Sequence, residues 1–194
     1  MAKKWSNKNL PGALHFVTGN INNRRPIFKI EENCQVFLEE LQNLRKETEC
    51  KLIAFVMMPD HLHLIVNPKN GDIQQWTGAL KSLSAKRLIK LAPEGFYLQP
   101  NGENQVWQES FKALPLWSEW MIWQKINYIH NNPLKGNLVK SAKDYRWTSF
   151  RYFYKLEFEE HLKVDEEWWF ADDVRKLSVA MAEWDEALKE KYKK

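Results

Sequence analysis

The chain has 194 residues, 44% of them hydrophobic and 28% charged, with 29 Lys and Arg against 25 Asp and Glu. This length suits one domain with a short appendage. The 10 Trp, 10 Phe and 6 Tyr supply ample apolar surface for a core, which argues against a disordered chain. No stretch reaches the roughly 18–20 apolar residues of a membrane span, and the first residues lack the apolar centre of a signal peptide. The two cysteines form no disulfide framework or zinc-ribbon spacing, so we expect a soluble, cytoplasmic, reduced protein.

Charge is distributed unevenly along the chain. Residues 155–194 contain 8 Lys and Arg against 12 Asp and Glu, a net charge of −4, whereas residues 1–154 carry a net charge of +8. A basic body with an acidic tail suggests a polyanionic partner for the body. Ordinary solvation of a mildly basic surface explains the same imbalance, and charge alone favours that explanation.

The predicted elements begin with a strand at 13–21, where apolar and β-prone residues precede a polar loop. Residues 31–48 place apolar side chains at helical spacing after acidic residues, which predicts an amphipathic helix. Two apolar runs of strand length follow at 51–58 and 61–66, separated by a two-residue turn. A connection this short makes them an antiparallel pair.

A second helix is predicted over 72–91, with Asp72 as its N-cap and with one apolar and one basic side. Residues 105–111 predict a further strand. A helix is expected over 117–130. Its end is placed there because Pro133 has to stop it nearby. A short helix over 148–155 and a helical, aromatic tail complete the chain. The order β-α-β-β-α-β predicts an α+β fold with a ferredoxin-like antiparallel sheet, helices on one face and a C-terminal helical extension.

The sharpest local motif is His61-Leu62-His63 in the expected second strand of the hairpin. Alternate side chains of a strand share a face, so both imidazoles point one way and Leu62 points the other. Two imidazoles on one face form half of a metal site. Two exposed strand histidines without a ligand remain the alternative, because short motifs have many false positives.

A second motif, Tyr128-Ile-His-Asn-Asn132-Pro, follows the apolar residues of the late helix. Tyr128 and Asn132 are four residues apart, so on a continuing helix they face the same way. A half-buried packing tyrosine is the alternative for Tyr128. Spacing does not choose among the tyrosines, and the competitors are Tyr97, Tyr145, Tyr152 and Tyr154.

Three blocks in order, FVMMPDHLHLIV, WQKINYIHNNPLKGNLV and DYRWTSFRYF, resemble the IS200-like single-tyrosine (Y1, HUH) transposases, in particular the REP-associated tyrosine transposase branch. The resemblance covers roughly residues 12–154. It implies a catalytic domain over 1–154, followed by an acidic, aromatic helical tail over 155–194. The tail has no counterpart, and Lys112-Ala113-Leu114-Pro115 departs from the pattern of many relatives, which puts local DNA contacts in doubt.

The resemblance implies that His61 and His63 are the histidine pair of the HUH motif, that Tyr128 is the nucleophile and that Asn132 completes the metal site. It implies Mg²⁺ or Mn²⁺ as cofactor, with imidazole ligands favouring Mn²⁺ by ligand softness. The activity implied is nicking and rejoining of single-stranded DNA beside a hairpin of a palindromic repeat, through a 5′-phosphotyrosine with a free 3′-OH. No Gly-rich phosphate loop occurs in the chain, so ATP is not expected to take part.

DNA contacts are expected from basic residues of the body, namely Arg24 and Arg25 in the loop after the first strand and Lys81, Lys86, Arg87 and Lys90 on the second helix. Exposed tryptophans among Trp117, Trp120 and Trp107 offer stacking surfaces, although core packing is the commoner role. The rival functions are a non-catalytic, sequence-specific DNA-binding regulator derived from a transposase and a metal-dependent nuclease that uses water. The expected location is bacterial-type and nucleoid-associated, and the expected state is a monomer, with a homodimer as the alternative.

Overall fold

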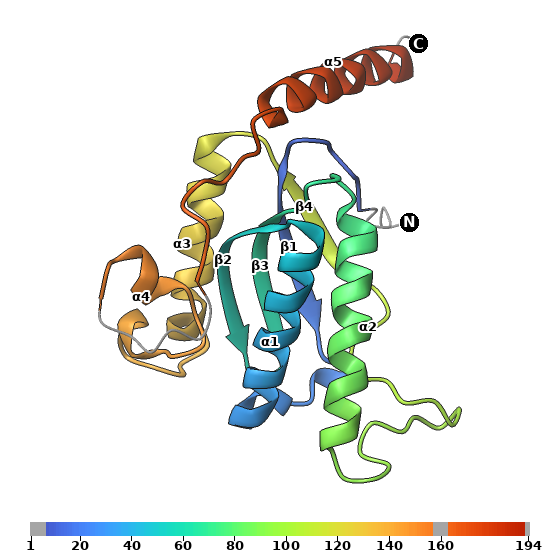
Figure 1. The fold of residues 1–194 in the computed structure, drawn as a ribbon, viewed down its shortest axis with the longest axis vertical. Helices are drawn as coiled ribbons and strands as arrows, with labels where there is room; N and C mark the ends of the chain where they lie inside the picture. Colours follow the sequence, from blue (N-terminus) through green and yellow to red (C-terminus); the bar gives the residue numbers. More distant parts are fainter. Residues whose placement is uncertain (1–6, 157–162, 193–194) are drawn as a thin grey trace.

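A computed structural model describes residues 7–156 and 163–192, which are organised around a four-stranded antiparallel sheet (Figure 1). The strands are β1 (Leu14–Asn20), β2 (Lys51–Met58), β3 (His61–Asn67) and β4 (Lys112–Leu116). They lie in the order β2-β3-β1-β4, and every neighbouring pair is antiparallel. The expected α+β fold is confirmed, and the β2–β3 hairpin begins and turns where its apolar runs predict.

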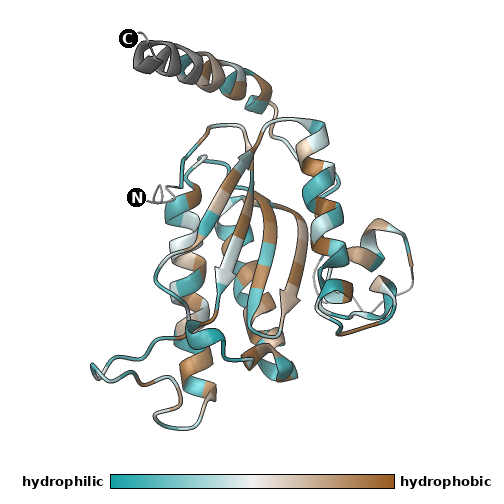
Figure 2. Ribbon diagram, turned by 180° about the vertical axis from the view of Figure 1, so that it is seen from behind, coloured by the Kyte–Doolittle hydropathy of each residue, from teal (hydrophilic) through white to brown (hydrophobic). Residues whose placement is uncertain are grey.

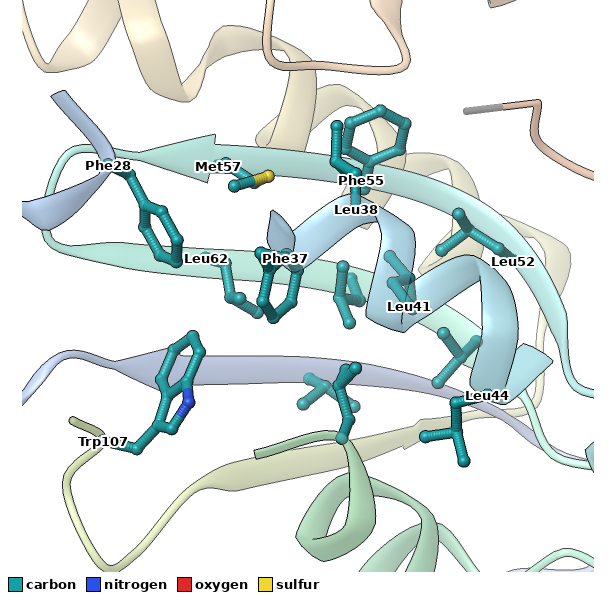
Figure 3. Packing of buried hydrophobic residues seen from close by; sticks show 14 of the residues in the cluster. Phe28, Phe37, Leu38, Leu41, Leu44, Leu52, Phe55, Met57, Leu62 and Trp107 are labelled. Atoms are coloured by element: carbon teal, nitrogen blue, oxygen red, sulfur yellow. The ribbon is translucent and has the colours of Figure 1, made fainter. Parts of the chain in front are cut away.

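The two helices of the β-α-β-β-α-β unit, α1 (Glu31–Thr48) and α2 (Ile73–Leu91), lie side by side on one face of the sheet (Figure 1). The Asp72 side chain caps α2 by accepting a hydrogen bond from the Gln75 amide at 2.9 Å, as the sequence predicts. The main core lies beneath these helices, where apolar side chains of α1 face those of the strands (Figure 3). The members labelled there are Phe28, Phe37, Leu38, Leu41, Leu44, Leu52, Phe55, Met57, Leu62 and Trp107.

The third long helix, α3 (Glu119–Lys135), packs on the opposite face of the sheet, beside β2 (Figure 2). Its buried stripe of Ile122, Ile126 and Ile129 packs with residues of β1, β2 and β3 in a second apolar cluster. The helix extends five residues beyond the expected end at 130 and includes Pro133. Pro133 removes one N–H donor from the helix, but the turn after it is completed because the Gly136 amide bonds to the Asn132 carbonyl at 2.9 Å.

The prediction of a strand at 105–111 is wrong. That segment contributes a single bridge, between Ile21 and Trp107, and the fourth strand follows it as β4. β4 is an edge strand, so only one side of its backbone has to pair with the sheet. The Ala113 amide points away from β1 and bonds to the Asn7 side chain at 2.8 Å, so Pro115, two residues on, also places its missing donor on the outer side. A proline that argues against a central strand is therefore compatible with this one.

After α3 the chain passes through the short helix α4 (Phe150–Phe153) and ends with α5 (Asp173–Tyr192). Aromatic side chains of the tail pack on the body: the Trp168 ring lies 5.4 Å from that of Trp123 on α3. α5 itself extends away from the sheet (Figure 1). Residues 157–162 and 193–194 of the expected tail lie outside the described residues. None of the described helices combines the length and apolar character that crossing a membrane requires.

Candidate metal and tyrosine site

β3 places His61 and His63 on the face of the sheet that α3 covers, while Leu62 between them points into the main core. The centroids of the two imidazole rings lie 5.1 Å apart, with the rings nearly perpendicular. His63 is buried. The alternation expected of a strand therefore brings both rings together at the end of β3 nearest the hairpin turn.

In each imidazole, a hydrogen-bond partner engages the Nδ1 atom. His61 Nδ1 lies 2.6 Å from Asp60 Oδ1, and His63 Nδ1 lies 2.9 Å from Thr18 Oγ1 on the neighbouring strand β1. His63 Nε2 is buried and has no hydrogen-bond partner among the described residues. Histidines that ligate metals commonly donate their second N–H to a carboxylate or another oxygen in this way. In the tautomer in which each Nδ1 carries the proton, the Nε2 atoms carry the lone pairs that a cation needs.

The electrostatics of His63 favour its neutral form. Burial above all, together with the nearby His61, Lys125 and Arg24, lowers the pKa of His63 to about 3. A neutral imidazole keeps the lone pair that a metal needs. At neutral pH, therefore, His63 is ready to act as a ligand without first losing a proton.

α3 places Tyr128 beside this pair. The Tyr128 ring lies edge-on to His63 with centroids 5.2 Å apart, and Phe16 of β1, stacked on His63, also contacts it. Tyr128 is 36% exposed, so its phenol is open to solvent. The Nζ atoms of Lys125 and Lys135 lie 5.7 and 5.2 Å from the centre of the Tyr128 ring.

The competing tyrosines have other surroundings. Tyr97 is buried in the main core, and burial raises its pKa. The Tyr145 hydroxyl donates to the Met57 carbonyl at 2.6 Å, and burial likewise raises the pKa of that phenol. The Tyr152 hydroxyl bonds to Glu166, and Tyr154 packs against Phe150. Of the tyrosines in the described part of the chain, Tyr128 is the one whose ring contacts the histidine pair.

Asn132 lies one turn beyond Tyr128 on α3 and is buried. Its amide oxygen is the kind of neutral donor that joins imidazoles around Mg²⁺ or Mn²⁺. The described residues contain no cluster of three or more His, Cys, Asp or Glu side chains suited to a metal. The ring contacts bring together the imidazoles of His61 and His63 and the phenol of Tyr128, whereas Asn132 is placed by its position one turn further along the same helix.

The model of the family described as "Transposase IS200 like" matches residues 12–132, which span β1 through the helix that carries Tyr128 and Asn132. The chain belongs to the IS200-like transposase family. The matched segment contains all four residues of the expected metal and tyrosine site, whereas α5 lies outside it.

Two curated relatives resemble this IS200-like protein over most of its length. A Haemophilus influenzae protein assigned as a REP-associated tyrosine transposase is 26% identical over 153 residues, which cover 75% of this chain and 84% of the relative. The REP-associated tyrosine transposase of Escherichia coli is 21% identical over 141 residues, covering 73% and 78%. A solved REP-associated tyrosine transposase bound to a REP hairpin matches the fold with a TM-score of 0.66 at 18% identity, covering 87% of this chain and 95% of that one.

The expected DNA-contacting residues of this IS200-like protein lie in two places. Arg24 lies near the histidine pair, where it forms an ion pair with Asp60 at 2.8 Å. Arg25 instead donates to the carbonyls of Phe96 and Gln105 and so anchors the loop before β4. The other four lie on α2, across the sheet from the histidine pair: Lys81 donates to the Gln108 and Glu109 carbonyls, Arg87 pairs with Glu39 and Glu40, and Lys86 and Lys90 are exposed.

Sequence reasoning missed the residues that hold the site in place. Phe16 and Thr18 become neighbours of His63 through the pairing of β1 with β3, which places Thr18 directly opposite His63. Asp60 adjoins His61 in the chain, and a carboxylate next to a candidate ligand is a signal that could have been used. Lys125 is one helical turn before Tyr128, a spacing that would have found it.

Proposed function

We propose that this protein is a metal-dependent endonuclease and strand transferase for single-stranded DNA, with Tyr128 as the nucleophile. The observation that carries the proposal is the contact between the Tyr128 ring and His63, whose buried Nε2 is unpartnered among the described residues. Because the phenol and the two imidazoles lie next to one another, they can act on the same phosphate group.

The residues present fit a divalent cation, Mg²⁺ or Mn²⁺, which His61 Nε2, His63 Nε2 and the Asn132 amide would hold. When bound, such a cation supplies Lewis-acid polarisation of a phosphate and helps to orient the scissile bond. Asp60 and Thr18 would keep the two imidazoles in the tautomer that presents Nε2. Two nitrogen ligands favour Mn²⁺ over Mg²⁺.

Tyr128 would attack the scissile phosphorus through its phenolic oxygen. The new bond joins this oxygen to the 5′ phosphate, and the bond from phosphorus to the 3′ oxygen breaks. The phenol proton passes to solvent and the departing 3′ oxygen takes up a proton to become a free 3′-OH. The ammonium groups of Lys125 and Lys135 lie beside the Tyr128 ring, where they would offset the negative charge of the phosphate under attack. Attack of a 3′-OH on the tyrosyl ester reverses the step and conserves the energy of the phosphodiester.

The substrate we propose is single-stranded DNA next to a hairpin of a palindromic repeat. The names of the two curated relatives, which refer to REP elements, support this substrate, and so does the REP hairpin named in the solved relative. The positive charge of the body is suited to a polyanion.

The test is a denaturing gel assay for a covalent adduct between the protein and an end-labelled hairpin oligonucleotide with a single-stranded flank, in Mn²⁺. We expect an adduct with the wild-type chain and none with Tyr128→Phe, which preserves the ring contact with His63 and removes only the hydroxyl. An adduct that persists in Tyr128→Phe would remove Tyr128 from the nucleophile role. Binding without any cleavage would instead support a DNA-binding regulator, and a free 5′ phosphate without attached protein would support a nuclease that uses water.

A further inference from the structure

The side of α3 opposite its buried isoleucines carries a row of exposed side chains that passes through the proposed nucleophile, Tyr128. Trp120, Gln124, Tyr128, Asn131 and Lys135 follow one another at spacings of four, four, three and four residues. Such spacings keep side chains on one helical face. All five are exposed, whereas the isoleucines on the opposite side of the helix are buried. We refer to these five residues as the outer row of α3.

An open cavity of about 530 Å³ lies along this row. Its lining combines three amide side chains, two lysines, one leucine and the phenol, contributed by Gln124, Asn127, Asn131, Lys125, Lys135, Leu134 and Tyr128. Neither Lys125 nor Lys135 forms an ion pair with a residue in the described part of the chain. The two ammonium groups are therefore free of competing carboxylates there, so they can meet phosphates.

Trp120 is the more exposed of the two tryptophans of α3. It is 70% exposed, while its neighbour Trp123 packs against Trp168 and Phe153 with ring centroids 5.4 and 6.3 Å away. Burial of a large aromatic side chain is normally favourable, yet Trp120 does not join the contacts between Trp123, Trp168 and Phe153. Tyr128 is eight positions beyond Trp120, which places the two residues about 12 Å apart along the helix axis. A single strand held at Tyr128 can span that distance within a few nucleotides.

We infer that single-stranded DNA flanking the scissile phosphate follows the outer row of α3, with a base stacked on Trp120. Lysines contact the backbone, amides reach base edges and the indole supplies a stacking platform, which is the combination used by proteins that bind single strands. A protein partner is less well matched, because interface cores are depleted in lysine and the row has one apolar anchor. The inference rests on the proposed function only in taking Tyr128 as the point where the scissile phosphate lies.

Fluorescence anisotropy without metal tests the binding surface apart from the chemistry. The probe is a labelled oligonucleotide of about twenty thymidines, because base stacking on aromatics tolerates sequence. We expect Trp120→Ala to raise Kd about 5- to 100-fold, and Trp120→Phe to remain near the wild-type value. Leu91→Ala is the matched control: Leu91 is an exposed apolar residue at the end of α2, across the sheet, and its removal should leave Kd unchanged.

A second probe separates stacking from charge. An oligonucleotide of the same length that lacks its bases should bind the wild-type chain and Trp120→Ala equally weakly, because no base is present to stack. Thermal unfolding of each variant followed by circular dichroism should match the wild-type profile, since Trp120 is exposed. Equal affinity of wild type and Trp120→Ala for the thymidine probe would overturn the inference.

The adduct assay distinguishes failure of the inference from failure of the proposed function. Binding of thymidines that depends on Trp120, together with no adduct from the wild-type chain, would sink the proposed chemistry and leave the binding surface in place. Adduct formation that Trp120→Ala leaves unchanged, at oligonucleotide concentrations below Kd, would support the chemistry and reject the path along α3.

Discussion

Thr18 is the residue on which the orientation of the buried imidazole depends. Its hydroxyl, 2.9 Å from His63 Nδ1, can hold this ring in the tautomer that presents Nε2 towards the proposed cation. We expect Thr18→Val, which keeps the shape of the side chain and removes the oxygen, to weaken Mn²⁺ binding about 10- to 100-fold. Thr18→Ser keeps the hydroxyl and should bind nearly as the wild type does. Isothermal titration of Mn²⁺ makes the comparison, and unchanged affinity in Thr18→Val would show that the hydroxyl does not position the ring.

His130 makes the stability of the fold depend on pH. It is buried on α3, its Nε2 lies 3.0 Å from Ser149 Oγ, and burial lowers its pKa from 6.5 to about 4. Between those two values the unfolded chain binds a proton at this position that the folded chain does not, so stability falls as the pH falls from 6.5 towards 4. The loss from this residue approaches roughly 3 kcal/mol at the lower value.

Urea unfolding at a series of pH values should show the effect of His130. We expect His130→Gln, which can still hydrogen-bond to Ser149, to be less stable than the wild type at pH 7 but to lose less stability on acidification. The difference between the two slopes isolates His130 from the other histidines. Parallel curves for the two proteins over this pH range would contradict the assignment.

At the scale of single residues, the sequence predicts the ligands better than their supports. His61 and His63 share a face because side chains of a strand alternate, which follows from local geometry alone. Tyr128 was one of several tyrosines until the family resemblance singled it out. Phe16 and Thr18 adjoin His63 only through the register of β1 against β3, a long-range property that no local pattern encodes.

Among the elements, α3 determines where the phenol lies relative to the histidine pair. Its first turn is capped by Ser118, whose hydroxyl accepts a hydrogen bond from the Met121 amide at 3.3 Å. We expect Ser118→Ala to lower the free energy of unfolding by about 1 kcal/mol, because an N-terminal donor of the helix loses its partner. Ser118→Asp supplies another capping oxygen and should retain the stability. Chemical denaturation measures both, and equal losses in the two variants would indicate that the cap is not the cause.

Element boundaries could be predicted where the pattern is strong and local. The bounds of α1 and β2 agree with the sequence prediction, because apolar periodicity and the residues flanking each element agree. β4 was missed because Lys112 and Pro115 do not look like strand residues, and only their place at the edge of the sheet makes them acceptable. The far end of α3 was missed because a proline was given more weight than the buried contacts of that helix.

For the whole molecule, Asp165 fastens the tail to the body. Its carboxylate accepts hydrogen bonds from the Leu52 amide at 2.7 Å and from Arg45 at 2.6 Å, and its own amide bonds to the Leu52 carbonyl. We expect Asp165→Ala to speed hydrogen exchange at the Leu52 amide about 5- to 30-fold, because a charged partner worth about 1–2 kcal/mol is lost. Asp165→Asn keeps an acceptor oxygen and should give an intermediate rate. Mass spectrometry of exchanged peptides reads out both, and a wild-type rate in Asp165→Ala would mean that the tail is held by other contacts.

The molecule covers both borders of its sheet with its own segments. Along β2, the Met57 amide bonds to the Trp147 carbonyl and the Ser149 amide to the Phe55 carbonyl, with Asp165 further along the same strand. Along β4, the Asn7 side chain accepts a hydrogen bond from the Ala113 amide, and Pro115 has no N–H to donate. A strand from a second copy would have to displace these groups before it could pair. We therefore predict a monomer in light scattering at micromolar concentration, and a stable dimer would contradict this.

The same closure has a consequence for handling and for evolution. A sheet whose edge strands are already hydrogen-bonded within the molecule does not pair with strands of other molecules. This protein should therefore not form fibrils at high concentration. The closure also shifts the burden of any subunit association onto helical surfaces, where substitutions can accumulate without disturbing the β-scaffold that carries the imidazoles.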